Sequence, residues 1–218
     1  MSAPGAGSAV RPQQDAWETT RLEAFSDGVL AIAITLLVLE FHLDDKAVEA
    51  HGLGRELGGL AGSYAAYATS FIVIAIMWIN HHAMFRMIAR SDQLLMFFNA
   101  LLLGVIAFLP FPTSVIARYH DGAQGRPAVL LYGGTLVLVA LLYNLVWRYA
   151  TARGFLQPGI DPRALRTIHR RYLAGPVVYA LALVLGLLAW QLALVLWVGL
   201  ALLFLLPSPS PFSADPEP

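Results

Sequence analysis

Residues 21–43, RLEAFSDGVLAIAITLLVLEFHL, decide how this chain folds, because a short polar cluster runs directly into an apolar segment. The cluster holds Arg21, Glu23, Ser26 and Asp27, and the segment after it is long enough for a helix to cross a bilayer. Ionisable groups at the end of a membrane helix must keep water or a partner, so they usually mark function before packing. We therefore predict a functional membrane helix, with the first span at about residues 25–43.

This helix has two unlike faces when it is drawn with about 100° per residue. The face centred on Ile32 carries Phe25, Gly28, Ile32, Thr35, Leu36, Leu39 and Leu43. The opposite face carries Asp27, Leu30, Ile34, Leu37, Val38 and Phe41. A carboxylate that faces acyl chains has no partner, so the Asp27 face should meet other helices of the protein. The Ile32 face then points either to lipid or to a symmetry axis.

The composition is that of a membrane protein. Hydrophobic residues make up 58% of the chain and charged residues 13%, whereas a soluble domain typically carries about 25% charged residues. The chain has no cysteine, which excludes disulfides and thiolate metal sites.

Apolar stretches predict an all-α polytopic membrane protein with six transmembrane helices per chain. After the first span we expect further spans at about 60–82, 94–117 and 127–148, and two short spans made by dividing the apolar run 175–206 near Trp190 and Gln191. Ser91 and Asp92 should begin the third span as N-cap and first-turn acid, and Pro110 and Pro112 should break it.

The one long polar segment, residues 149–172, predicts a short basic helix at the lipid surface or an ordinary cytoplasmic loop. Asp161 and Pro162 read as its N-cap and first helical position. With six spans, Lys46, Arg55, Arg118 and Arg126 fall on one side and the other ten of the fourteen basic residues on the opposite side. The positive-inside rule then places both termini in the cytoplasm.

Three motifs resemble one known family. They are Arg21-x-x-x-Phe25-Ser26-Asp27, then Trp78-x-Asn80-His81-His82-x-x-Phe85, and the break Leu109-Pro110-Phe111-Pro112-Thr113. With the spacing of the spans, they make residues 18–206 similar to the lysosomal potassium channel family of the transmembrane protein 175 type, and to its bacterial members in particular. We expect 18–206 to form the six-helix transmembrane channel domain, with disordered tails at 1–17 and 207–218.

The resemblance implies a potassium-selective channel and not an enzyme. It implies a homotetramer in the bacterial inner membrane, in which each chain gives its first helix to a central pore. The expected partners are membrane lipids and permeating potassium ions, with no cofactor, no metal site and no nucleic acid.

In the family, the signature residues anchor the pore helix to neighbouring helices through hydrogen bonds. The resemblance carries this role to Arg21, Phe25, Ser26 and Asp27, with Trp78, Asn80, His81 and His82 as partners. Arg21 and Asp27 lie about 120° apart on a helix, so we expect each to reach groups elsewhere rather than each other.

The expected constriction is apolar. The chain has no TVGYG-type carbonyl filter and no ring of acids midway along a span. Ile32, Leu36 and Leu39 recur at i, i+4 and i+7 and would stack as rings around an axis, where partial dehydration favours potassium over sodium. The resemblance implies that Ile32 is the main constriction and that Thr35 influences selectivity. Without the signature, plain lipid or helix packing would be the default interpretation of these residues.

Two alternatives remain open. A secondary transporter or proton pathway would carry broken helices and polar groups near the membrane midplane, whereas the ionisable residues here lie near span ends and no repeat is visible. An intramembrane metal-dependent hydrolase would use Asp27 with histidines, but the adjacent His81 and His82 point about 100° apart on a helix and are poorly placed to chelate one ion. We interpret Asn99 and Asn144 as residues that make interhelical hydrogen bonds rather than bind a ligand.

Overall fold

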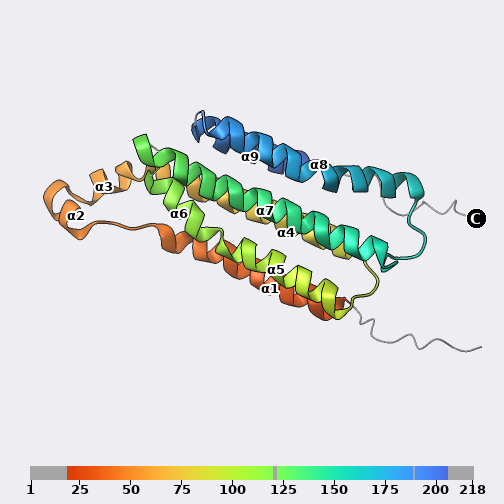
Figure 1. Cartoon of the computed structure of the whole chain (residues 1–218). Coiled ribbons are helices and arrows are strands. Elements are labelled where there is room, and N and C mark those ends of the chain that lie inside the picture. Colours follow the sequence, from red (N-terminus) through yellow and green to blue (C-terminus); the bar gives the residue numbers. More distant parts are fainter. Residues whose placement is uncertain (1–18, 120–121, 189, 206–218) are drawn as a thin grey trace, which may run out of the picture.

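The structure is a computed structural model that describes residues 19–119, 122–188 and 190–205, and most of these residues form helices, with one isolated β-bridge between Ile88 and Leu156 in the connections. Both predicted disordered tails lie outside the described residues. The long helices run side by side in three layers, with α1 and α5 in the first, α4 and α7 in the second, and α8 and α9 in the third (Figure 1). Their bounds are α1 Thr20–Leu36, η1 Leu37–Glu40, α4 Ala61–Phe85, α5 Gln93–Phe108, α6 Pro110–Tyr119, η2 Gly122–Gln124, α7 Gly125–Ala152, α8 Pro162–Gly186 and α9 Trp190–Leu205.

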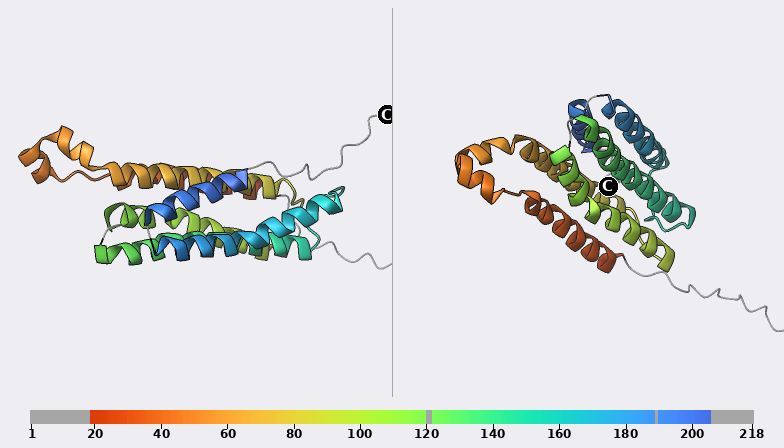
Figure 2. Two further views of the ribbon diagram at one scale, coloured as in Figure 1. Left: turned by 90° about the horizontal axis from the view of Figure 1, so that it is seen from above. Right: turned by 60° about the vertical axis from the view of Figure 1, so that its left-hand side comes forward.

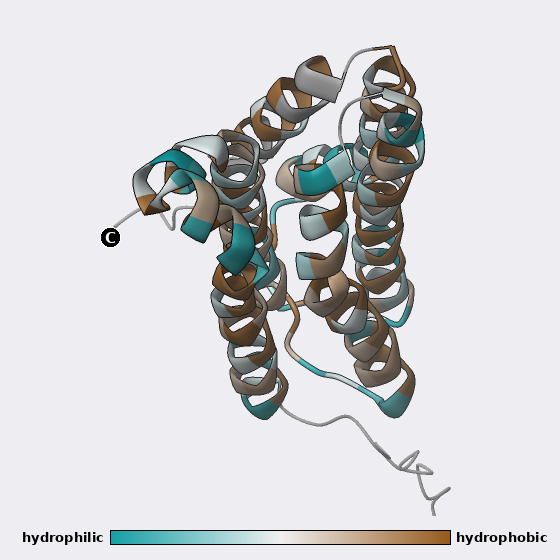
Figure 3. Cartoon of the chain, turned by 90° about the vertical axis from the view of Figure 1, so that its left-hand side faces the viewer, coloured by the Kyte–Doolittle hydropathy of each residue, from teal (hydrophilic) through white to brown (hydrophobic). Residues whose placement is uncertain are grey.

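Within the described residues, four helical stretches are long and apolar enough to cross a membrane. They are Thr20–Glu40, Ala61–Phe85, Gln93–Tyr119 and Gly122–Ala152, at the positions predicted for the first four spans. Hydrophobic residues cover most of their length, and hydrophilic residues gather mainly at helix ends and connections (Figure 3). The predicted division of the last apolar run also appears, since α8 ends at Gly186 and α9 begins at Trp190.

The third stretch breaks where the prolines predict it. The helix α5 ends at Phe108 and α6 begins at Pro110, because proline has no backbone N–H to continue the ladder. At the start of α5 the N-cap is Asp92, whose Oδ1 accepts a hydrogen bond from the backbone N–H of Leu95 (2.8 Å). The prediction of Ser91 as N-cap was therefore wrong by one residue.

Two further elements differ from expectation. The acidic connection after α1 contains the short helices α2 (Asp45–His51) and α3 (Leu53–Gly59), which project beyond the bundle (Figure 2). The basic segment is not a separate surface helix, because α8 runs unbroken from Pro162 to Gly186. Buried residues lie on both sides of Pro176, with Ile168 before it and Tyr179 and Ala182 after it. Both the basic half and the apolar half of α8 therefore pack against the bundle.

The ends of the helices are tied together at one side of the bundle. Backbone hydrogen bonds join the α4–α5 and α7–α8 connections, from Ala89 N to Phe155 O (2.7 Å) and from Gln157 N to Met87 O (2.9 Å). Thr19, just before α1, also donates to Ile88 O (3.4 Å). We call this side the inner end, and the side that carries α2 and α3 the outer end.

Candidate functional site

The helix α1 lies at one edge of the bundle and buries only one of its faces. Leu30 and Ala33 are fully buried on the side that packs toward α4 and α5. Leu37, at the start of η1, is 1% exposed, and η1 packs toward α4 and α6. On the other face of α1, Ile32 is 59% exposed, and Leu39, which lies in η1, is 64% exposed. The first helix was predicted to run on to Leu43 as one α-helix, but it changes to η1 at Leu37. Phe25, Thr35 and Leu36 of the predicted pore face are also exposed, so none of the described elements of the chain covers this face.

The inner half of α1 is held by hydrogen bonds from two other helices. Trp78 of α4 donates through Nε1 to Asp27 Oδ1 (2.8 Å). Asn99 of α5 donates through Nδ2 to Ser26 Oγ (2.9 Å), and its Oδ1 lies 2.9 Å from His81 Nε2. These bonds join α1, α4 and α5, so they define both the rotation and the depth of α1.

Ser26, Asn99 and His81 form a series of buried hydrogen bonds, and counting the available protons gives the donor and the acceptor of each one. Ser26 spends its only hydroxyl proton on Leu22 O (2.7 Å), so its oxygen must accept from Asn99. The Asn99 carbonyl oxygen then accepts from His81, which places a proton on His81 Nε2. Ser26, His81 and Asn99 are each at most 1% exposed, so every bond in this chain is shielded from water.

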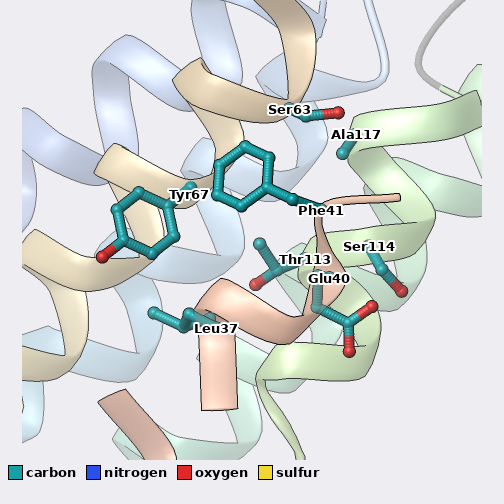
Figure 4. A pocket seen from close by; sticks show the side chains of 8 residues that line it. All are labelled: Leu37, Glu40, Phe41, Ser63, Tyr67, Thr113, Ser114 and Ala117. Carbon is teal, nitrogen blue, oxygen red and sulfur yellow. The ribbon is translucent and has the colours of Figure 1, made fainter. Parts of the chain in front are cut away.

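The outer end of α1 is held by different contacts. The chain leaves η1 at Phe41, whose ring packs against Tyr64 and Tyr67 of α4 with centroids 5.2 and 5.3 Å away. Arg118 of α6 donates through Nη2 to His42 Nδ1 (2.7 Å). Beyond this end a small pocket lies between η1, α4 and α6 (Figure 4), lined by Leu37, Glu40, Phe41, Ser63, Tyr67, Thr113, Ser114 and Ala117.

Not all the predicted partners meet α1. Asn80 donates to Ile76 O (2.9 Å) of its own helix, and His82 stacks on Trp78 with ring centroids 6.4 Å apart. Arg21 is exposed, and within the described residues no side chain pairs with it. Asn99 instead lies at the centre of the network, and its interhelical hydrogen bonds confirm the prediction for this residue. For Asn144, the other asparagine predicted to bond between helices, no such bond is seen among the described residues.

Thr35 is oriented as an acceptor on the exposed face. Its hydroxyl donates to Ile32 O (2.9 Å), so the lone pairs of its oxygen remain available. An oxygen in this state can coordinate a cation but cannot donate to one.

A metal site is not visible among the described residues, where no group of three or more His, Asp or Glu side chains is placed to hold an ion. The exposed face of α1 is uncharged between Asp27 and Glu40.

Residues 21–110 match the family model for the endosomal/lysosomal potassium channel TMEM175. A potassium channel of Chamaesiphon minutus is 41% identical over 199 residues, which cover 90% of this chain and 97% of that protein. This chain belongs to the TMEM175 family. A potassium channel of Streptomyces collinus is 42% identical over 179 residues, covering 81% of this chain and 86% of that protein.

The fold agrees with this family assignment. The crystal structure of a lysosomal potassium-selective channel TMEM175 homolog from Chamaesiphon minutus superposes with a TM-score of 0.78 and 39% identity, and the match covers 88% of this chain and 98% of that one. TMEM175 proteins are ion channels and not enzymes, and this member is a membrane protein.

Sequence reasoning missed the contacts that hold the outer end of α1. Phe41 and His42 lie in a connection with extended backbone at Phe41, and they meet Tyr64, Tyr67 and Arg118 from distant parts of the chain. Tyr64 and Tyr67 are spaced i, i+3 and so share a helix face, but no local pattern indicates which side chain they receive.

Proposed function

We propose that this TMEM175 protein is a subunit of a potassium-selective cation channel that works as a homotetramer. The first helix of each of four copies lines the central pore. Rings of Ile32, Leu36 and Leu39 form an apolar constriction in place of a carbonyl filter. The ion that permeates this pore is potassium.

One observation carries the proposal: α1 is anchored at both ends, yet its Ile32 face is left uncovered. A helix that only faced lipid would not need a defined rotation, because any apolar side would serve. The bonds from Trp78 and Asn99 hold one rotation, and that rotation turns the branched side chains away from the rest of the chain. Rotational symmetry would then bring the same face of every copy to one axis.

Selectivity follows from the chemistry of this face. A narrow apolar ring forces an ion to lose part of its hydration shell, and potassium loses water more easily than sodium. The Thr35 oxygen, with free lone pairs, replaces part of the lost hydration beside Ile32. The face offers no ionisable group between Asp27 and Glu40, as a proton relay or an ion-coupling site would require.

The proposed topology has six spans, with α8 and α9 as the fifth and sixth, in the bacterial inner membrane. Both termini lie in the cytoplasm, on the side of the inner end. The basic residues support this orientation, because ten of the fourteen fall on that side when the spans alternate.

The test is the reversal potential of purified protein in a planar bilayer under a potassium gradient. The proposal predicts a reversal potential that follows the potassium gradient, and an Ile32→Ala variant with a larger conductance and weaker preference for potassium over sodium. A reversal potential that is insensitive to potassium would contradict it. Exposed Leu181 of α8 provides the control, since Leu181→Ala should leave both quantities unchanged.

A further inference from the structure

The helix α8 carries three arginines along one line of its first half. Arg163, Arg166 and Arg170 follow one another at i, i+3 and i+7, which places them within about 60° around a helix. All three are exposed. We call them the arginine stripe.

The same line continues as an apolar surface. Leu173, Val177, Leu181 and Val184 are 58%, 59%, 59% and 61% exposed, and they lie within about 80° of arc that includes the stripe. Since α8 is unbroken, its exposed face changes from guanidinium groups to hydrocarbon between Arg170 and Leu173. This change takes about 4.5 Å along the axis, which is as abrupt as the boundary between lipid phosphates and acyl chains.

The arginine stripe has no acidic partner among the residues that the structure describes. Asp161, the acid closest in sequence, caps α8 by accepting from Arg163 N (3.0 Å). Asp92 is already engaged by the Tyr149 hydroxyl (2.7 Å) and by Arg153 (3.7 Å).

Helix stability does not account for the stripe either. Arg163 stands in the first turn of α8, where the helix dipole disfavours positive charge. The buried side of α8, with Ala164, Ile168 and Gly175, packs without help from the stripe. The three arginines therefore face outward, with their charge available to a partner outside the described bundle.

We propose that the arginine stripe binds the phosphate groups of anionic phospholipids in the leaflet at the inner end of the bundle. The acyl chains lie along the Leu173–Val184 surface. Side chains on a helix tilt toward its N-terminus, so Arg170 reaches from the apolar boundary toward the phosphates, and guanidinium groups bind phosphate oxygens in pairs. This inference rests on the proposed membrane position of α8, and it does not depend on ion conduction.

The test is native mass spectrometry of the detergent-purified protein titrated with phosphatidylglycerol and, separately, with phosphatidylcholine. The wild-type protein should prefer phosphatidylglycerol. The triple variant Arg163→Gln, Arg166→Gln, Arg170→Gln should bind it at least about tenfold more weakly, because each arginine near an anionic lipid contributes roughly fivefold to the affinity.

A matched control removes the same charge elsewhere. Arg86, Arg90 and Arg148 are exposed and lie near the inner end but outside the stripe. Their replacement by glutamine should change phosphatidylglycerol binding by less than about twofold, since charges far from the site are screened. A stripe variant with lysine at all three positions should retain most of the binding, and thermal unfolding without lipid confirms that each variant is folded.

Three results would overturn the inference: equal loss in both glutamine triples, equal affinity for phosphatidylcholine, or displacement of phosphatidylglycerol by inorganic phosphate at equal concentration. The last result would indicate a site for a free anion. If the wild-type protein prefers phosphatidylglycerol but carries no potassium current, the proposed function is contradicted and this inference is not. If the wild-type protein carries a potassium current but shows no preference for phosphatidylglycerol, this inference is contradicted and the proposed function is not.

Discussion

At the scale of single residues, two hydrogen bonds to neighbouring side chains on α1 decide which way this helix faces. Asp27 accepts a hydrogen bond from Trp78 of α4, and Ser26 accepts one from Asn99 of α5. Since Ser26 and Asp27 point about 100° apart, the two bonds together leave α1 little freedom to rotate. Ile32 and Thr35 then owe their exposure to contacts made two turns earlier in the chain.

Removal of the Asp27 carboxylate should destabilise the protein. In Asp27→Ala the indole N–H of Trp78 loses its acceptor, and bonds to charged groups of this kind are worth about 1–3 kcal/mol. We expect a lower midpoint of thermal unfolding in detergent and a lower yield of folded oligomer. Trp78→Phe should give a similar loss, and the double variant should lose less than the sum of the two. Wild-type stability and current in Asp27→Ala would refute the anchoring role.

Thr35 should set the preference for potassium through its oxygen. Thr35→Val keeps the shape of the side chain but removes the acceptor, so the permeability ratio of potassium to sodium should fall. Thr35→Ser keeps the oxygen and should retain more of the ratio. The measurement is the reversal potential with potassium on one side of the bilayer and sodium on the other. An unchanged ratio in Thr35→Val would rule out a role for the hydroxyl.

The candidate network could be predicted only in part. The polar residues at the end of a membrane helix indicated that α1 and α4 are tied together, because such groups need partners. Which of Trp78, Asn80, His81 and His82 point toward α1 depends on how α4 is rotated. The structure selects Trp78 and, through Asn99, His81, whereas Asn80 bonds to its own backbone.

At the scale of elements, the helices α4, α6 and α7 are joined by a chain of buried hydroxyl groups. Thr113 donates to Leu109 O (2.8 Å) at the break between α5 and α6, so it accepts from Ser70 (2.8 Å). Ser70 in turn accepts from the Tyr132 hydroxyl (2.9 Å). Ordered chains of this kind strengthen each bond, and this one holds α6 behind the outer end of α1.

Tyr132→Phe should lower stability by about 1 kcal/mol, because it removes the first donor of this chain at constant shape. Thr135→Val is the matched control on the same helix, since among the described residues the Thr135 hydroxyl bonds to Leu131 O one turn away and to no other helix. The free energy of unfolding in denaturant should fall more for Tyr132→Phe than for Thr135→Val. Equal losses of unfolding free energy in the two variants would mean that the linked hydroxyl groups of Tyr132, Ser70 and Thr113 add no stability beyond that of a single local hydrogen bond.

Close packing of α7 against α8 and α9 requires a glycine. A Cβ at Gly133 would lie 2.6 Å from Leu183 Cδ1 and 2.7 Å from Trp197 Cζ2, whereas a Cβ at Gly134 would meet nothing within 4 Å. Gly133→Ala should therefore cost about 1–3 kcal/mol through overpacking. Gly134→Ala should be neutral or slightly stabilising, and thermal unfolding of the two variants in parallel tests the difference. A Gly133→Ala variant with wild-type stability would show that Leu183 and Trp197 can move aside to accommodate a methyl group on α7.

The elements themselves were largely predictable, because hydrophobic runs and proline breaks are local signals. Pro110 indicated the α5–α6 break and Pro162 the start of α8. The error at α8 arose because composition marked residues 149–172 as polar, while the buried stripe that joins both halves of the helix depends on its neighbours. The short helices α2 and α3 were missed because Asp44 and Gly52, which bound them, also read as loop residues.

At the scale of the whole molecule, α1 lies at one edge of the bundle, where α4 and α5 cover only one of its sides. The opposite edge is formed by α8 and α9, and α8 carries the arginine stripe. This arrangement suits an assembly in which α1 points to an axis and α8 points to surrounding lipid. Sequence alone left the Ile32 face with two possible environments, because lipid and a symmetry axis both accept branched apolar side chains.

The most direct test of the central claim is cadmium block of a Leu39→Cys channel. The chain has no cysteine, so the introduced thiols are the only ones present. If the exposed faces of several copies of α1 and η1 surround one pore, the thiolates at position 39 converge and bind this soft metal ion, and the potassium current should fall and recover with a chelator. Val177→Cys on the exposed face of α8 should not respond. A Leu39→Cys current that is as insensitive to cadmium as that of the wild type would contradict the claim.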